Sequence, residues 1–122
     1  NINTLVIGHN KNQKQKSKLK HFTQITIFRL IQMLYYKAEE VGIKVIEINE
    51  AYTSGTSFLD QEYPTKENYN KKRRVKRGLF KTNTGKLINS DVNAAYQIMR
   101  KYDKDLNIKY SNKLYNPIIC DV

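Results

Sequence analysis

Residues 42–50 read Gly-Ile-Lys-Val-Ile-Glu-Ile-Asn-Glu, and they are the part of the chain that says most about its architecture. Four β-branched apolar residues fall within the six positions after the glycine, which predicts a short buried strand over residues 43–48. Glycine is the residue type that most often ends a helix, so Gly42 predicts that a helix stops directly before this strand.

The residues upstream supply that helix and a second strand. Apolar side chains between Thr23 and Val41 recur at steps of three and four, which predicts a helix whose broad apolar face belongs to the core rather than to a binding surface. Residues 4–7 form a short apolar run that Gly8 ends, which is typical of a buried strand. Strand, helix and strand in this order predict a crossover with parallel strands, and hence an α/β fold.

The pattern changes after Glu50. Residues 51–76 are polar and are expected to bury little, whereas residues 78–88 predict a hairpin whose turn lies at residues 83–85. Asn89, Ser90 and Asp91 offer the side chains that cap helices, so a last helix is expected to start at about Asp91. The tail over residues 102–122 is polar and basic, and we expect it to be loosely ordered.

Charge and composition limit the class of protein. The chain has 122 residues, with 22 Lys and Arg against 11 Asp and Glu, which gives a formal net charge of +11. Its length allows one core of modest size. An excess of positive charge favours a polyanionic partner, and nucleic acid is the first candidate. AT-rich coding DNA, which inflates Lys, Asn, Ile and Tyr, is the alternative source of part of this charge.

The cellular compartment follows from what the chain contains. A single cysteine, Cys120, cannot form an internal disulfide or make a zinc site by itself. No apolar run is long enough to span a membrane. We therefore expect a cytoplasmic protein with no membrane partner.

Two carboxylates are placed where a metal-dependent nuclease needs them. Glu50 closes the second strand and Asp91 opens the last helix, so both side chains could project from one edge of the sheet. Two-metal phosphodiester hydrolysis requires three or four converging carboxylates. Asp91 could instead be an ordinary helix cap, and Glu50 a solvated strand end. Glu47 is the rival carboxylate on the same strand.

A basic run is the candidate nucleic-acid contact. It lies near Tyr52, Tyr63, Tyr69 and Phe80, a combination of cations and aromatic rings that is typical of surfaces that bind single strands. The alternative is a solvated charged loop. The lysines between Lys11 and Lys20 are open to both interpretations. The residues of the run are Lys71, Lys72, Arg73, Arg74, Lys76 and Arg77.

Several motifs resemble a known family. The motifs are Leu5-Val6-Ile7-Gly8-His9-Asn10-Lys11, Asn49-Glu50-Ala51-Tyr52-Thr53-Ser54, Ser57-Phe58-Leu59-Asp60, Lys76-Arg77-Gly78-Leu79-Phe80-Lys81, Gly85-Lys86-Leu87-Ile88-Asn89 and Asp91-Val92-Asn93-Ala94-Ala95-Tyr96. They resemble, in order and over the chain to about Lys101, the C-terminal part of the TnpB (OrfB) proteins that insertion sequences encode.

The resemblance implies a transposase-associated, RNA-guided DNA endonuclease related to the type V CRISPR effectors, with DNA and a guide RNA as partners. Residues 1–101 would then be the C-terminal part of a RuvC-like, partial RNase H-like domain with a basic insert at about residues 52–88. Asp91 matches the family's last catalytic metal ligand, which would bind Mg²⁺. The usual family Glu is replaced here by Gly8, and Glu50 is its expected substitute.

The chain also departs from the family. The family's paired cysteines are absent between Tyr52 and Asp91, so no zinc is expected. No strand with an acidic residue precedes Thr4, so the chain is expected to be a C-terminal piece of a longer nuclease and to be inactive alone. The alternative is a nuclease-dead or remnant module that only binds DNA or RNA. An unrelated basic RNA-binding protein, such as a ribosomal one, explains the charge but not the ordered motifs.

Overall fold

The computed structural model describes residues 2–10, 18–108, 114 and 116–118, and side chains from residue 26 onward within its long helix. The chain divides into two compact units, residues 1–49 and residues 50–122, rather than a single core. The expectation that residues 102–122 are loosely ordered concerns a tail of which residues 109–113, 115 and 119–122 lie outside the described residues, as do Cys120 and most of the lysines between residues 11 and 20.

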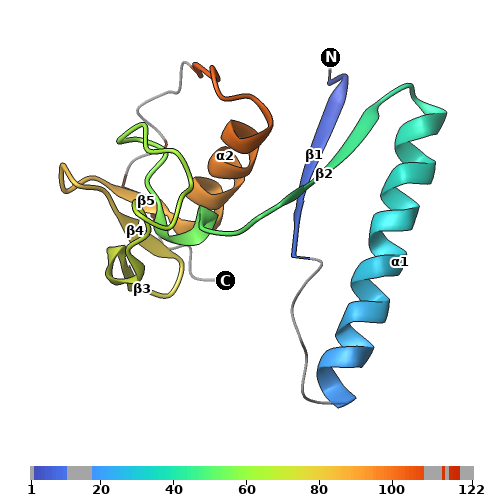
Figure 1. Ribbon diagram of the computed structural model, residues 1–122, viewed down its shortest axis with the longest axis horizontal. Helices are drawn as coiled ribbons and strands as arrows, with labels where there is room; N and C mark the ends of the chain where they lie inside the picture. The colour runs from blue at the N-terminus through green and yellow to red at the C-terminus, as the bar shows by residue number, and fades with distance from the viewer. Residues whose placement is uncertain (1, 11–17, 109–113, 115, 119–122) are drawn as a thin grey trace. The chain divides into compact units, whose positions relative to one another are not determined.

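The first unit is the predicted strand–helix–strand crossover (Figure 1). Strand β1 (Thr4–His9) is followed by helix α1 (Lys18–Glu40) and strand β2 (Lys44–Asn49). The two strands are parallel, with Val6 opposite Ile46. Gly42 has a φ of +71°, the left-handed conformation that ends a helix at low steric cost for glycine. The α/β prediction is confirmed, while the RNase H-like topology stays a prediction.

Helix α1 buries less of its apolar face than the sequence predicts. Within its described side chains, Ile31 and Ala38 are buried and Leu34 is intermediate. Phe28 and Met33 are 61% and 62% exposed. The reason is geometric, because a sheet of two strands is narrow and contacts only one stripe of a helix. In the described residues no helix is both long enough and apolar enough to cross a membrane.

The second unit combines a small antiparallel sheet with a helix. Strands β3 (Arg74–Lys76), β4 (Leu79–Lys81) and β5 (Leu87–Asn89) pair in that order, and helix α2 (Ser90–Tyr102) follows (Figure 1). Two 3₁₀ turns, η1 (Thr53–Gly55) and η2 (Lys71–Arg73), precede the sheet. Phe80 and Ile88 face each other across β4 and β5 and are fully buried, which confirms the predicted hairpin.

The start of α2 agrees with the predicted capping. The Asn89 side chain accepts hydrogen bonds from the backbone N–H groups of Asp91 and Val92 at 2.9 and 3.2 Å. These bonds satisfy two of the donors that the first turn of a helix leaves open. Asp91 is therefore in the first turn and is exposed, while Asn89 does the capping.

The expectation that residues 51–76 bury little is wrong. Thr56, Ser57 and Phe58 are almost fully buried, and Thr53 and Pro64 are buried as well. Residues 74–76, expected to be loop, form strand β3. Hydropathy missed the buried residues because polar side chains of α2, together with the Tyr96 ring, cover them. Strand β3 is exposed and is held by its pairing with β4.

Candidate nucleic-acid interface

One face of α2 holds the segment that precedes the sheet. Asn93 donates to the Thr56 carbonyl at 2.8 Å and accepts from the Phe58 backbone N–H at 3.0 Å. Gln97 donates to the Thr56 hydroxyl and to the Glu62 carbonyl, at 2.9 and 3.0 Å. Both side chains are fully buried, so their hydrogen bonds replace the water that the loop backbone would otherwise need.

Arg100 completes this face one turn further along. Its guanidinium donates to the carbonyls of Phe58 and Glu62 at 3.3 and 3.0 Å, and to the Gln97 side chain at 3.1 Å. It also lies 4.5 Å from the centre of the Phe58 ring, whose other neighbour is the stacked ring of Tyr96. Positions 93, 97 and 100 recur at helical spacing, so a single face of α2 fixes residues 56–62.

Glu62 ties that fixed loop to the basic residues. Its carboxylate receives two hydrogen bonds from the Arg73 guanidinium, at 2.6 and 2.8 Å, and one from the Ser57 backbone N–H at 2.8 Å. The Asn83 side chain adds a fourth at 3.1 Å. Burial acts to raise the pKa of Glu62, but the hydrogen bonds and the charge of Arg73 outweigh it and hold the pKa below its ordinary value.

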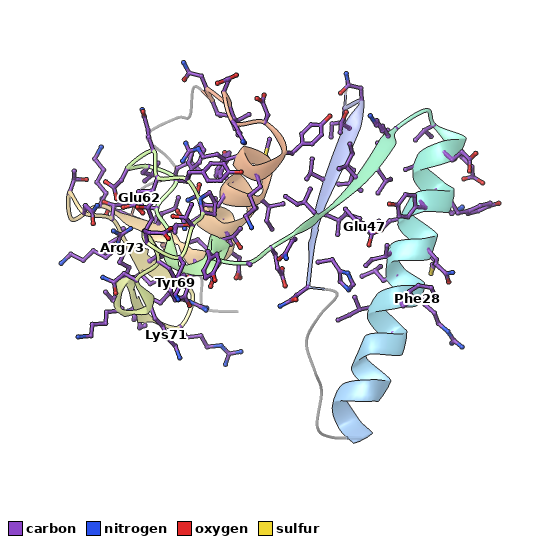
Figure 2. All side chains as sticks on the ribbon, viewed as in Figure 1. Phe28, Glu47, Glu62, Tyr69, Lys71 and Arg73 are labelled. Atoms are coloured by element: carbon purple, nitrogen blue, oxygen red, sulfur yellow. The ribbon has the colours of Figure 1, made fainter. Side chains whose placement is uncertain are left out.

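The predicted nucleic-acid-binding residues fall into two groups. We call residues 71–77, which form η2, β3 and the turn after it, the basic segment. Arg73 is only 15% exposed in its side chain, because Glu62 holds it inward (Figure 2). The other cations of the segment are exposed, namely Lys71, Lys72, Arg74, Lys76 and Arg77. One cation therefore anchors the segment while five face solvent.

The turn at the end of the basic segment is tight. Lys76 pairs with Leu79, so Arg77 and Gly78 alone make the connection between β3 and β4. Gly78 has a φ of +74°, a left-handed conformation that glycine adopts without steric strain. The turn projects Arg77 from the end of the hairpin, where its side chain is exposed.

Two tyrosines lie beside the basic segment. The rings of Tyr52 and Tyr69 meet edge to face, with centres 5.9 Å apart and planes at 69°. A Cβ built on Gly55 would clash with the Tyr69 ring, so this ring rests directly against the glycine backbone. The Asn70 backbone N–H donates to the Gly55 carbonyl at 2.9 Å and holds the two segments together. Figure 2 shows Tyr69 near Lys71 in this unit.

This close approach gives a first prediction. Gly55→Ala should force the Tyr69 ring away and lower the free energy of unfolding by about 1–3 kcal/mol, as overpacking does. Urea unfolding followed by circular dichroism measures it. In a Tyr69→Ala background, Gly55→Ala should lower the free energy of unfolding clearly less, because the ring that it would clash with is absent. An equal cost in both backgrounds would show that the ring is not what requires glycine.

The predicted carboxylates both belong to the second unit, but the described contacts do not bring them together. Glu50 interacts electrostatically with Lys101, in the last turn of α2, and Lys101 donates to the Ala51 carbonyl at 2.6 Å. Burial lowers the pKa of Lys101, and the Glu50 charge opposes that shift. Asp91 is ten residues earlier on the same helix, which corresponds to a rise of about 15 Å.

The rival carboxylate Glu47 belongs to the first unit. It accepts a hydrogen bond from the Tyr35 hydroxyl at 3.1 Å, and one of its oxygens lies 3.9 Å from His9 Nδ1. Glu47 therefore has protein partners from β1 and α1. Within the described residues, no three His, Cys, Asp or Glu side chains gather closely enough to hold a metal ion. The expected absence of zinc stays a prediction.

Three residues that organise this interface are not among those that the sequence predicts for the site. They are Asn93, Gln97 and Arg100, whose signal in the sequence is a polar residue at each step of three or four along the predicted helix. Glu62 had no signal in the sequence, because its partner Arg73 is eleven residues away and sits in a run of exposed cations.

The fold and the site define an α/β protein whose second unit is a helix-supported, three-stranded sheet that presents a cationic segment. The Cas12f1-like, TNB domain family matches residues 28–98, more than half of the chain. The chain belongs to this family, which supports the TnpB- and Cas12-related part of the resemblance. No curated protein matches the chain.

Proposed function

We propose that residues 50–122 bind nucleic acid through the exposed cations of the basic segment, as part of a TnpB-like, RNA-guided DNA endonuclease of the OrfB type that acts in the cytoplasm. The observation that carries this proposal is the display of five exposed cations in a segment that one part-buried ion pair anchors. A solvated charged loop needs no such anchor. Membership of a Cas12-related family supports nucleic acid as the partner, with DNA and a guide RNA as the specific expectation.

The electrostatic part of this proposal predicts a steep dependence on salt. Each phosphate neutralised by Lys or Arg releases counterions, so five contacts to a single strand should weaken binding about 100-fold between roughly 50 and 200 mM salt. Fluorescence anisotropy with a labelled single-stranded oligonucleotide measures it. Binding that does not change over this range would contradict the proposal.

The contribution of the basic segment can be separated from the net charge. Lys71→Gln combined with Lys72→Gln should reduce the slope of log K against log salt by about 1.4, because two phosphate contacts are lost. Lys37→Gln combined with Lys44→Gln removes the same charge from exposed positions of the first unit. This control should leave the slope nearly unchanged. Equal effects of the two pairs would assign the binding to overall charge alone.

Catalysis is the less complete part of the proposal. The described residues do not form a Mg²⁺ site by themselves, since two carboxylates are fewer than two-metal hydrolysis needs, and Glu50 interacts with Lys101. We therefore propose Glu50 and Asp91 as Mg²⁺ ligands only together with an Asp from another segment of the whole nuclease. In this chain Asn89 fixes the backbone at Asp91, and Glu50 interacts electrostatically with Lys101.

It follows that the 122-residue chain should bind nucleic acid without cutting it. A labelled DNA strand incubated with the purified chain and Mg²⁺ should remain intact on a denaturing gel. Cleavage by the chain that Asp91→Ala abolishes would show that it holds a complete catalytic centre. The second candidate function, a binding module without catalysis, is favoured if the whole protein containing this chain also fails to cut.

A further inference from the structure

The Tyr52 and Tyr69 side chains form an aromatic surface that remains partly exposed to solvent. They are 41% and 38% exposed, although their rings contact each other. One face of the Tyr69 ring rests against Gly55, which leaves the exposed part of the ring for another partner. Aromatic rings normally bury most of their surface, so two neighbouring exposed rings call for an explanation.

The backbone at Tyr52 supports a functional explanation. Tyr52 has a φ of +67°, a left-handed conformation that is costly for a residue with a bulky side chain. The fold maintains it, because the Thr56 hydroxyl donates to the Tyr52 carbonyl at 2.7 Å and the 3₁₀ turn η1 begins at the next residue. Such conformations concentrate at binding sites.

The two rings are also fixed before any ligand arrives. Tyr69 is held against Gly55 by the Asn70–Gly55 backbone hydrogen bond, so little side-chain freedom remains to be lost on binding. The next residues are Lys71 and Lys72, both exposed, and the Asn70 side chain accepts from the Lys72 backbone N–H at 3.0 Å. Cations therefore flank a fixed aromatic surface.

We propose that Tyr52 and Tyr69 form a stacking site for an unpaired nucleobase, while Lys71 and Lys72 contact the adjacent phosphates. The inference rests on the proposed function and narrows it to single-stranded nucleic acid. In a duplex the faces of the bases are occupied by their neighbours, so a stacking site selects strands whose bases are free. Stacking of a base on an aromatic side chain is sequence-tolerant, because every base has a π-face.

The test uses the full chain, a single-stranded oligonucleotide and the matching duplex. Tyr69→Leu should weaken binding of the single strand about 10-fold, the middle of the range for one stacked base, and should change duplex binding less than about 2-fold. Tyr69→Phe should keep the single-strand affinity because it keeps the ring. Tyr36→Leu, which alters an exposed tyrosine of α1, is the control and should change neither affinity.

Two results would overturn the inference. If Tyr69→Leu binds the single strand as well as the original chain while the salt dependence persists, the stacking site is wrong and the proposed function stands. If neither nucleic acid binds in a salt-dependent way, both are wrong. A photo-crosslink from an oligonucleotide containing 5-iodouracil reports on the unaltered chain, so it does not depend on the folding of a variant. A crosslink to Tyr52 or Tyr69 supports the site, and crosslinks confined to other peptides overturn it.

Discussion

Glu62→Gln is expected to lower the free energy of unfolding of the second unit by about 2–3 kcal/mol, because it breaks the charge-assisted hydrogen bonds of a part-buried ion pair. The substitution leaves the Arg73 guanidinium without its counter-charge while both side chains are 15% exposed. It also weakens the hydrogen bonds from Ser57 and Asn83 that the carboxylate receives. Hydrogen exchange at the buried Phe80 and Ile88 amides reports the stability of this unit.

A matched control separates this effect from a general loss of negative charge. Glu67→Gln removes the same charge in the same unit from an exposed residue, and should change the free energy of unfolding by less than about 0.5 kcal/mol. If the free energy of unfolding falls by the same amount in both variants, the Glu62–Arg73 ion pair does not stabilise the second unit. If Glu62→Gln also weakens binding of nucleic acid, the loss shows that Arg73 positions the basic segment.

The same ion pair predicts a dependence on pH. Because the folded state lowers the pKa of Glu62, its contribution to stability is present above the ordinary carboxyl value of 4.5 and is lost as the pH falls through the lowered folded value. The original chain should therefore lose stability on acidification more steeply than the Glu62→Gln variant. Parallel pH profiles of the two chains would contradict the assignment.

Asn93→Asp is also expected to be disruptive and to lower the free energy of unfolding by about 3 kcal/mol or more. The Asn93 amide donates to the Thr56 carbonyl, and a carboxylate there would instead face that oxygen with like partial charge, in a fully buried position. Exposed Asn68, which makes one hydrogen bond to the Tyr63 carbonyl, is the control. Asn68→Asp should cost less than about 1 kcal/mol in the same urea titration. Similar losses at both positions would mean that α2 does not hold the loop.

The regular elements could be predicted from the sequence because local physics determines them. The apolar runs at residues 4–7 and 43–48, and the helical spacing between them, led to a parallel pair that the structure confirms. Gly42 marked the helix end correctly, and the turn at residues 83–85 placed the hairpin. In each case, the residues that predict the element lie close together in the sequence.

The candidate interface could be predicted only in part, because its order comes from contacts distant in sequence. The basic run was visible as composition, but which of its cations faces inward depends on Glu62. The burial of Thr56 depends on Asn93 and Gln97, about forty residues later. Hydropathy reads these residues as solvated, whereas the fold buries them as hydrogen-bonded pairs. The metal-ligand roles of Glu50 and Asp91 stay predictions that rest on the resemblance.

An NMR titration of the 122-residue chain with a single-stranded oligonucleotide at low salt would locate the nucleic-acid interface residue by residue. We predict that backbone amide shifts change at Tyr52, Tyr69 and the basic segment, and that these changes diminish as salt is raised. The backbone amide shifts of β1 and β2 should not change. Changes confined to residues 1–49, or spread evenly over all exposed lysines, would contradict the claim that the basic segment is the nucleic-acid interface.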